Sequence, residues 1–175
     1  MKTLRTVVSA GAAMLLVALV DVGPLAAQEL SFHPMITEEC EEQRPELSER
    51  EQCIGWAANA CMENTQGGGS TMGMNGCLDA EWQYWDTRLN QHYKEAMARA
   101  KAFDVDMATR ENGLLSAADS LRDMQRAWIA FRDAKCDFVR SQWSGGTGQG
   151  PAMLSCLMQE TGRQALWLQV QAGNM

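Results

Sequence analysis

The stretch that decides the fold is Leu121-Arg-Asp-Met-Gln-Arg-Ala-Trp-Ile-Ala-Phe-Arg-Asp-Ala-Lys-Cys136. Leu121, Gln125, Trp128, Arg132 and Cys136 follow one another at steps of three or four residues, so they share one helix face. That face carries an amide, an indole and a guanidinium where an ordinary core helix would be apolar, and it ends at a cysteine. The stretch therefore predicts a helix that is held to the rest of the chain by polar contacts and a disulfide bond.

The beginning of the chain has the pattern of a secretory signal peptide, residues 1–27. Lys2 and Arg5 precede an apolar run, and Leu25-Ala26-Ala27 offers a cleavage site of small residues. The run is about 14 residues long, short of the roughly 20 that a helix needs to span a bilayer. No later segment is apolar enough to span one. We therefore expect a periplasmic or secreted protein with no membrane span in the mature chain.

All six cysteines lie after this leader. An even number of cysteines in a small exported domain is typical of disulfide bonds. Several pairings are possible, and we favour the three that each close a short segment. A zinc site is not expected, because no two cysteines have zinc-ligand spacing and the chain has only two histidines, so we predict neither a metal nor another cofactor. The favoured pairs are Cys40–Cys53, Cys61–Cys77 and Cys136–Cys156.

The charge of the chain narrows the class of partner. The formal net charge is −7, and removal of the leader makes it one unit more negative. Nucleic acid and anionic lipid are disfavoured as partners, because both need basic patches. A cationic protein partner remains possible. The acidic residues are most concentrated between Glu38 and Glu51, where seven glutamates stand against Arg44 and Arg50.

The spacing of apolar residues predicts an all-α fold. We interpret residues 28–60 as an acidic leader, loose up to Glu39, followed by a first helix that starts at a capping box of Ser48 and Glu51 and ends at Met62. Residues 61–170 form the main helical domain. Two long helices are expected there, Cys77–Phe103 and Met107–Ser141, packed as an antiparallel hairpin. A last helix starts at Pro151. The prediction is a disulfide-stapled antiparallel bundle of about four helices.

Two glycine-rich segments, 67–76 and 144–151, separate these helices. We interpret both as loops, each tethered by a disulfide at its flanks. A phosphate-binding loop would need a Gly-Lys-Ser/Thr ending, which neither segment has.

Polar residues lie on or beside the apolar stripes of the two long helices. They fit either a recognition or catalytic cluster, or a hydrogen-bonded network that locks the two helices together. We favour the structural network, because no nucleophile–base pair accompanies these residues. Glu81 and Asp86 do not form the carboxylate pair of a glycosidase, since residues five apart do not share a helix face. The predicted network consists of Asp86, Asn90, Tyr93, Gln125, Trp128 and Arg132.

Three blocks of sequence then carry a resemblance. They are Glu81-x3-Trp85-Asp86-x2-Leu89-Asn90-x2-Tyr93, Gln125-Arg126-x-Trp128-Ile129-x2-Arg132-x3-Cys136, and Gly145-Gly146-Thr147 before Cys156-Leu157-x3-Thr161-x-Arg163. Their order resembles the LprI-type lysozyme inhibitor N-terminal domain of exported bacterial proteins, over about Cys61 to Leu168. The resemblance implies a small, disulfide-linked helical domain in the periplasm or cell envelope, and inhibition of lysozyme. The Cys40 and Cys53 pair and the acidic segment are additions to that pattern.

These features lead to a first hypothesis, a non-enzymatic binding protein that inhibits lysozyme by occluding its cleft. The acidic segment would steer a basic lysozyme into contact, and a glycine-rich loop would cover the cleft. The residues expected to act are Glu38, Glu39, Glu41 and Glu42 for charge, and Thr71, Met72, Gly145, Gly146 and Thr147 for the loops.

The alternative hypothesis is a structural or assembly module of the envelope that binds another protein through a helix face. Such a module would present a contiguous exposed apolar patch, for which Trp56, Trp143 and Trp167 are candidates.

Overall fold

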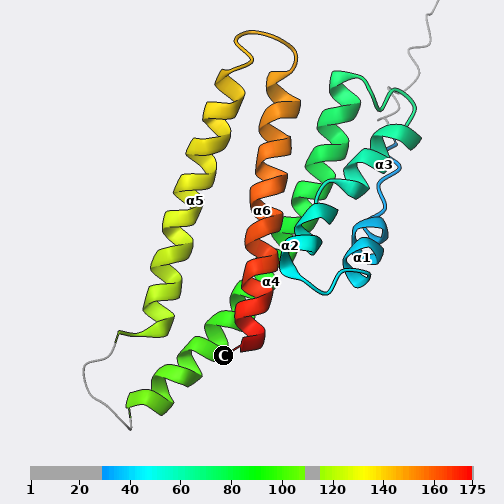
Figure 1. Cartoon of the computed structure of the whole chain (residues 1–175). Coiled ribbons are helices and arrows are strands. Elements are labelled where there is room, and N and C mark those ends of the chain that lie inside the picture. The colour runs from blue at the N-terminus through cyan, green and yellow to red at the C-terminus, as the bar shows by residue number, and fades with distance from the viewer. Residues whose placement is uncertain (1–28, 109–114, 175) are drawn as a thin grey trace, which may run out of the picture.

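The computed structural model describes residues 29–108 and 115–174, and all regular structure in these ranges is helical (Figure 1). The predicted signal peptide lies outside the described residues. The all-α prediction is confirmed, although the helices are more numerous than about four. No helix in the described ranges is long and apolar enough to cross a membrane. The elements are α1 (Met35–Glu42), α2 (Leu47–Arg50), the 3-10 turn η1 (Glu51–Cys53), α3 (Trp56–Asn64), α4 (Thr71–Ala108), α5 (Ala117–Ser141) and α6 (Gln149–Asn174).

The three disulfide bonds have the predicted pairing. Cys40–Cys53 ties α1 to η1, Cys61–Cys77 ties α3 to α4, and Cys136–Cys156 ties α5 to α6. The paired Cα atoms are 5.7, 5.7 and 5.4 Å apart, within the normal range for disulfides. Three such bonds are typical of a protein that folds in an oxidising compartment.

The core lies between α4 and α6, which run in the same direction along the length of the molecule (Figure 1). Trp85 and Leu89 of α4 pack there with residues of α6 that include Leu166 and Leu168. The expected antiparallel hairpin of two long helices is not confirmed as the centre of the fold, because α4 packs mainly on α6 and contacts α5 less extensively. Helix α5 packs mainly on α6 and adds no residue to the buried centre of this cluster, because its buried face is narrow and partly polar.

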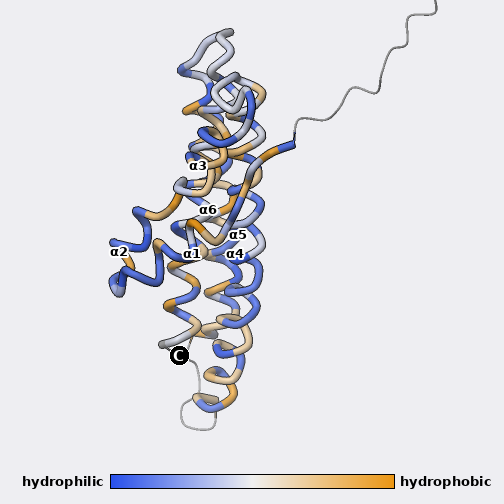
Figure 2. Tube along the Cα trace, turned by 90° about the vertical axis from the view of Figure 1, so that its right-hand side faces the viewer, coloured by the Kyte–Doolittle hydropathy of each residue, from blue (hydrophilic) through white to orange (hydrophobic). Residues whose placement is uncertain are grey.

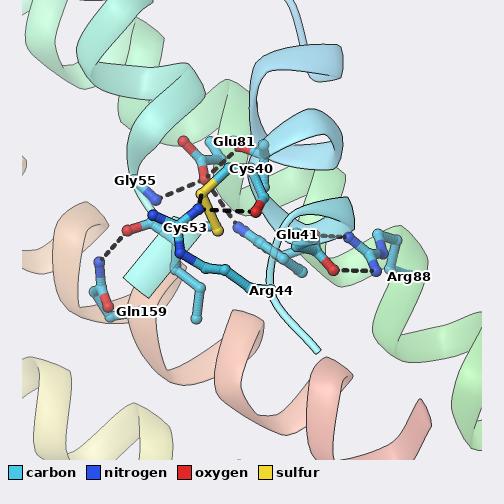
Figure 3. Close-up of a disulfide and its surroundings, with 11 residues drawn as sticks. Cys40, Glu41, Arg44, Cys53, Gly55, Glu81, Arg88 and Gln159 are labelled. Carbon is cyan, nitrogen blue, oxygen red and sulfur yellow. Dashed lines mark hydrogen bonds and ion pairs between the residues drawn. A yellow bond between two sulfur atoms is a disulfide. The ribbon is translucent and has the colours of Figure 1, made fainter. Parts of the chain in front are cut away.

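The amino-terminal region differs most from the expected loose leader and single first helix. Residues 35–42 are already helical, and Ser48 lies inside α2 instead of capping a longer helix. The chain breaks at Ile54, which is extended, and at Gly55, whose φ is +101°. Glycine adopts this left-handed conformation without steric cost. The break allows Cys53 to reach Cys40 and starts α3 in a new direction (Figure 3).

The boundary between α4 and α5 also lies later than expected. Helix α4 continues through Met107 to Ala108, and α5 begins only after Ser116, which caps it by accepting a hydrogen bond from the Asp119 amide. Asp104 lies four residues before the end of α4. It caps α5 from inside α4, because its carboxylate accepts hydrogen bonds from the Ala117 and Ala118 amides at 2.7 and 3.0 Å.

Candidate functional site

The first glycine-rich segment is a compact corner, and its second half is helical. Thr71 and Met72, predicted to lie in a loop, form the first turn of α4. The backbone of the preceding turn lies directly on this helix: a Cβ at Gly73 would be 2.5 Å from the Cα of Gly68. A Cβ at Gly68 would in turn lie 2.8 Å from the carbonyl carbon of Met62. These glycines permit close backbone packing, so the interpretation of residues 67–76 as a flexible loop is wrong.

The loop residues predicted for partner binding nevertheless gather at one end of the molecule. Helices α4 and α6 begin side by side there, since a Cβ at Gly150 would lie 2.8 Å from the Asn75 side chain (Figure 1). Thr71 is half-buried at this end. We call the exposed part of the end the tip; it consists of Met72 in α4 and of Trp143, Gly145, Gly146 and Thr147 in the turn between α5 and α6.

The turn that forms most of the tip is compact, with backbone hydrogen bonds from Gly146 to Trp143 and from Gln149 to Gly146. Gly145 has a φ of +73°, which favours glycine. The Trp143 ring lies over the backbone of Gly148, where an added Cβ would clash with the ring. Trp143 is still 54% exposed and Met72 is 75% exposed. The tip thus combines an exposed indole and thioether with exposed backbone and a threonine hydroxyl, on a base braced by Cys136–Cys156.

The four glutamates predicted to steer a partner divide into two pairs. Glu41 forms a two-pronged ion pair with Arg88 of α4 (Figure 3). Glu38 accepts a hydrogen bond from the Tyr84 hydroxyl at 3.3 Å. These two side chains therefore fasten α1 to α4. Glu39 and Glu42 are exposed. Figure 2 shows the region around α2 as a largely hydrophilic projection on the side of the long helices.

Tyr84 should provide a spectroscopic signal for this attachment of α1. Burial raises the pKa of Tyr84 to about 12, although Arg88 opposes the shift. We expect one of the two tyrosines to ionise near pH 12, with Tyr84→Phe removing that component from an absorbance titration at about 295 nm. Because the pKa is raised, the stabilising contribution is complete below pH 10 and is lost as the pH rises through 12. A late component that persists in Tyr84→Phe would contradict this assignment.

The six residues of the predicted polar network line a single cleft between α4 and α5, of about 450 Å³. We call it the motif cleft, because most of its lining comes from the first two sequence blocks. Leu89, Arg122, Arg126 and Ile129 complete the lining. The structure thus brings together all six residues that the sequence singled out.

The hydrogen bonds described in the motif cleft stay within one helix or point to α6. Asn90 donates to the backbone and the carboxylate of Asp86, each at 2.9 Å. Gln125 accepts a bond from Gln164 of α6 at 3.0 Å, and the Arg132 guanidinium stacks on Trp128 with 5.1 Å to the ring centroid. A network that locks α4 to α5 remains a prediction.

Glu81 has a role that sequence reasoning missed. Its side chain is fully buried, and its carboxylate accepts bonds from the amides of Gly55 and Ala58 at 2.7 and 2.6 Å (Figure 3). Trp85 and Thr37 donate to the same carboxylate at 3.0 and 3.4 Å. Burial raises the pKa of Glu81, and these four hydrogen bonds oppose that shift. The carboxylate therefore caps the start of α3 and connects α1, α3 and α4.

Comparison with known proteins places this geometry in context. The family model of the lysozyme inhibitor LprI matches residues 61–168. An uncharacterized protein of Rhizobium meliloti (strain 1021) is 29% identical over 92 residues, covering 53% of this chain and 66% of that relative. An uncharacterized 17.7 kDa protein from the puhA 5' region of Rhodobacter capsulatus is 24% identical over 137 residues, covering 78% of this chain and 84% of that relative. No solved structure gives a significant match.

In the described ranges, the fold and its sites define a disulfide-linked, helical protein with a compact tip and a polar motif cleft. The family match contains all of α4 and α5 and most of α6, and so includes the tip and the motif cleft. The chain belongs to the lysozyme inhibitor LprI family, because the model matches more than half of it. The resemblance inferred from the three sequence blocks is thereby confirmed. Helices α1 and α2 and the Cys40–Cys53 bond precede the matched region.

Proposed function

We propose that this protein is a non-enzymatic, exported binding protein that inhibits lysozyme by placing its tip over the lysozyme cleft. The observation that carries the proposal is the membership of the LprI family together with an exposed, disulfide-braced tip. Buried aromatic anchors dominate the binding energy of most protein interfaces. Trp143 is the exposed aromatic residue of the tip, and it projects from a turn that is already ordered.

The tip also offers chemistry suited to a glycosidase cleft. Such enzymes act with a pair of carboxyl groups and bind sugars through hydrogen bonds and ring stacking. Thr147 offers a hydroxyl donor, the exposed Gly145 and Gly146 allow close backbone approach, and Trp143 offers a flat ring in place of a sugar. Because the turn is preformed, little conformational entropy is lost when it binds.

Electrostatic steering is assigned to a smaller set of residues than the sequence suggested. Glu38 and Glu41 already have partners on α4, so the exposed Glu39 and Glu42 are the members of that group proposed to attract a basic lysozyme. Attraction between exposed charges is screened over roughly 8–10 Å at physiological ionic strength. Association should therefore slow as salt rises, while contacts at the tip remain.

The substitution Trp143→Ala should weaken inhibition by a factor of about ten or more. Loss of an aromatic anchor typically costs about 2 kcal/mol of binding free energy. The measurement is the concentration of mature protein that halves lysis of a peptidoglycan suspension by c-type lysozyme. Asn90→Ala is the matched control, since this exposed residue lies in the motif cleft on α4. Loss of inhibition in Asn90→Ala but not in Trp143→Ala would move the contact to the motif cleft and overturn the role of the tip.

A further inference from the structure

Helix α5 has a solvent face that the rest of the fold does not use. It lies at the edge of the molecule, with α6 between it and α1 to α3 (Figure 1). The residues that it buries are Ala118, Gln125 and Cys136, which share one narrow face. Since α4 and α6 form the core without it, the opposite face of α5 is open along its length.

This open face carries an apolar stripe. Ala127, Phe131, Ala134 and Phe138 follow at steps of four, three and four residues, which is the heptad spacing of helices that pair with other helices. Phe131 and Phe138 are 59% and 64% exposed, and the two alanines are exposed as well. We call these four residues the α5 stripe. Exposed apolar residues arranged in this way on a charged helix mark an interaction surface.

The charges beside the α5 stripe form a repeat. Asp123-x2-Arg126 recurs as Asp137-x2-Arg140, two heptads later and on the same flank of the helix. When two copies of one helix pair in antiparallel orientation, the residues on one side of the apolar stripe face the residues on the same side of the stripe in the other copy. If the two-fold axis passes between Phe131 and Arg132, Asp123 faces Arg140 of a second copy, and Arg126 faces Asp137. Within one copy these residues already pair along the helix, Arg140 with Asp137 at 3.1 Å and Arg126 with Asp123 at 4.0 Å. The antiparallel register brings a second opposite charge to each of them, so the two repeats are complementary to each other.

The same register matches large residues with small ones. It brings Phe138 of one copy to within two residues of the level of Ala127 of the other, and it places the two Phe131 residues next to the axis. Helices that interdigitate large and small side chains pack at the density of a protein core. A surface that complements itself in both charge and volume is suited to a two-fold, isologous contact.

We propose that the α5 stripe is the docking surface for a second copy of this chain, with the two α5 helices antiparallel. The contact buries the stripe of each copy and places the two Asp-x2-Arg repeats in cross-chain pairs. The two tips then lie at opposite ends of the dimer and stay free. A stripe that instead served an unrelated protein would leave the purified chain monomeric.

Sedimentation equilibrium of the mature, oxidised protein tests this proposal. We expect a dimer that Phe131→Glu converts to a monomer, with an unchanged circular dichroism spectrum because Phe131 is exposed. Arg126→Asp should weaken the dimer about tenfold by facing Asp137 with a like charge, and adding Asp137→Arg should restore it. Lys94→Glu, an exposed charge change on α4, is the control and should have no effect.

Three results would overturn the proposal. The first is a protein that remains monomeric up to about 1 mM. The second is a dimer that survives Phe131→Glu, and the third is a double variant, Arg126→Asp with Asp137→Arg, that does not recover association.

Discussion

Substitution of Glu81 by alanine should lower the free energy of unfolding by about 3–5 kcal/mol, the cost of removing one member of a buried charged network. The carboxylate accepts four hydrogen bonds in a fully buried position. Its removal leaves the amides of Gly55 and Ala58 without an acceptor at the start of α3 and opens a cavity beside Trp85. For a domain of this size, such a loss is a large part of the total stability.

The measurement for Glu81 is urea unfolding followed by circular dichroism, with the disulfides intact. Gln83→Ala is the matched control, since Gln83 is exposed on the same helix and bonds only within it, to Asp79. Its free energy of unfolding should stay within about 0.5 kcal/mol of the unsubstituted protein. A loss below about 1 kcal/mol in Glu81→Ala would show that the carboxylate is not the cap of α3.

Substitution of Gly73 by alanine should destabilise the protein by about 3 kcal/mol, at the upper end of the usual cost of overpacking. The added methyl group would meet the backbone of Gly67 and Gly68, which is fixed between the Cys61–Cys77 bond and the first turn of α4. Backbone cannot move aside as a flexible side chain can. The corner must therefore open or the helix must lose its first turn.

Gly69→Ala provides the control for Gly73→Ala. It lies in the same glycine-rich segment, but a Cβ there would meet no atom within 4 Å. Its φ is not in the left-handed region, so we expect a change within about 0.5 kcal/mol. Equal effects of the two substitutions in urea unfolding would mean that the segment behaves as the flexible loop that its composition suggests.

The disulfide pairing and the helical class were predictable from the sequence because both depend on local patterns. Each disulfide joins cysteines 13 to 20 residues apart, and short closures of this kind are the simplest solution for a small exported domain. The periodicity that predicted a helix over 77–103 reports one buried face. It does not indicate which helix packs on that face. The sequence pattern therefore does not reveal that α6 is the main partner of α4.

The glycine-rich corner and Glu81 were missed for different physical reasons. Glycine serves equally in a flexible linker and where two backbones touch, and only the fold distinguishes these uses. Glu81 does carry a signal in the sequence, since it falls on the stripe of Leu78, Trp85 and Leu89. A single carboxylate on such a stripe indicates a buried acceptor. The donors that it meets come from α1 and the start of α3, and sequence spacing does not reveal them.

The candidate site was predicted in part. The six polar residues of the two long helices do come together in the motif cleft, because α4 and α5 present them on facing sides. Of the partner-binding set, Gly145, Gly146 and Thr147 are exposed as expected, whereas Glu41 is taken up by Arg88 and Thr71 is half-buried in a helix. Long-range pairs such as Glu41 with Arg88 depend on how α1 folds back, which local pattern does not encode.

The central claim is tested most directly by following the turbidity of a peptidoglycan suspension during lysis by c-type lysozyme, with increasing amounts of the mature, oxidised protein. Protection should rise with the dose of the protein. Protection should disappear when the protein has been reduced, alkylated and freed of reductant before mixing, because the tip depends on the Cys136–Cys156 bond. Complete lysis at a large molar excess of folded, oxidised protein would contradict the claim.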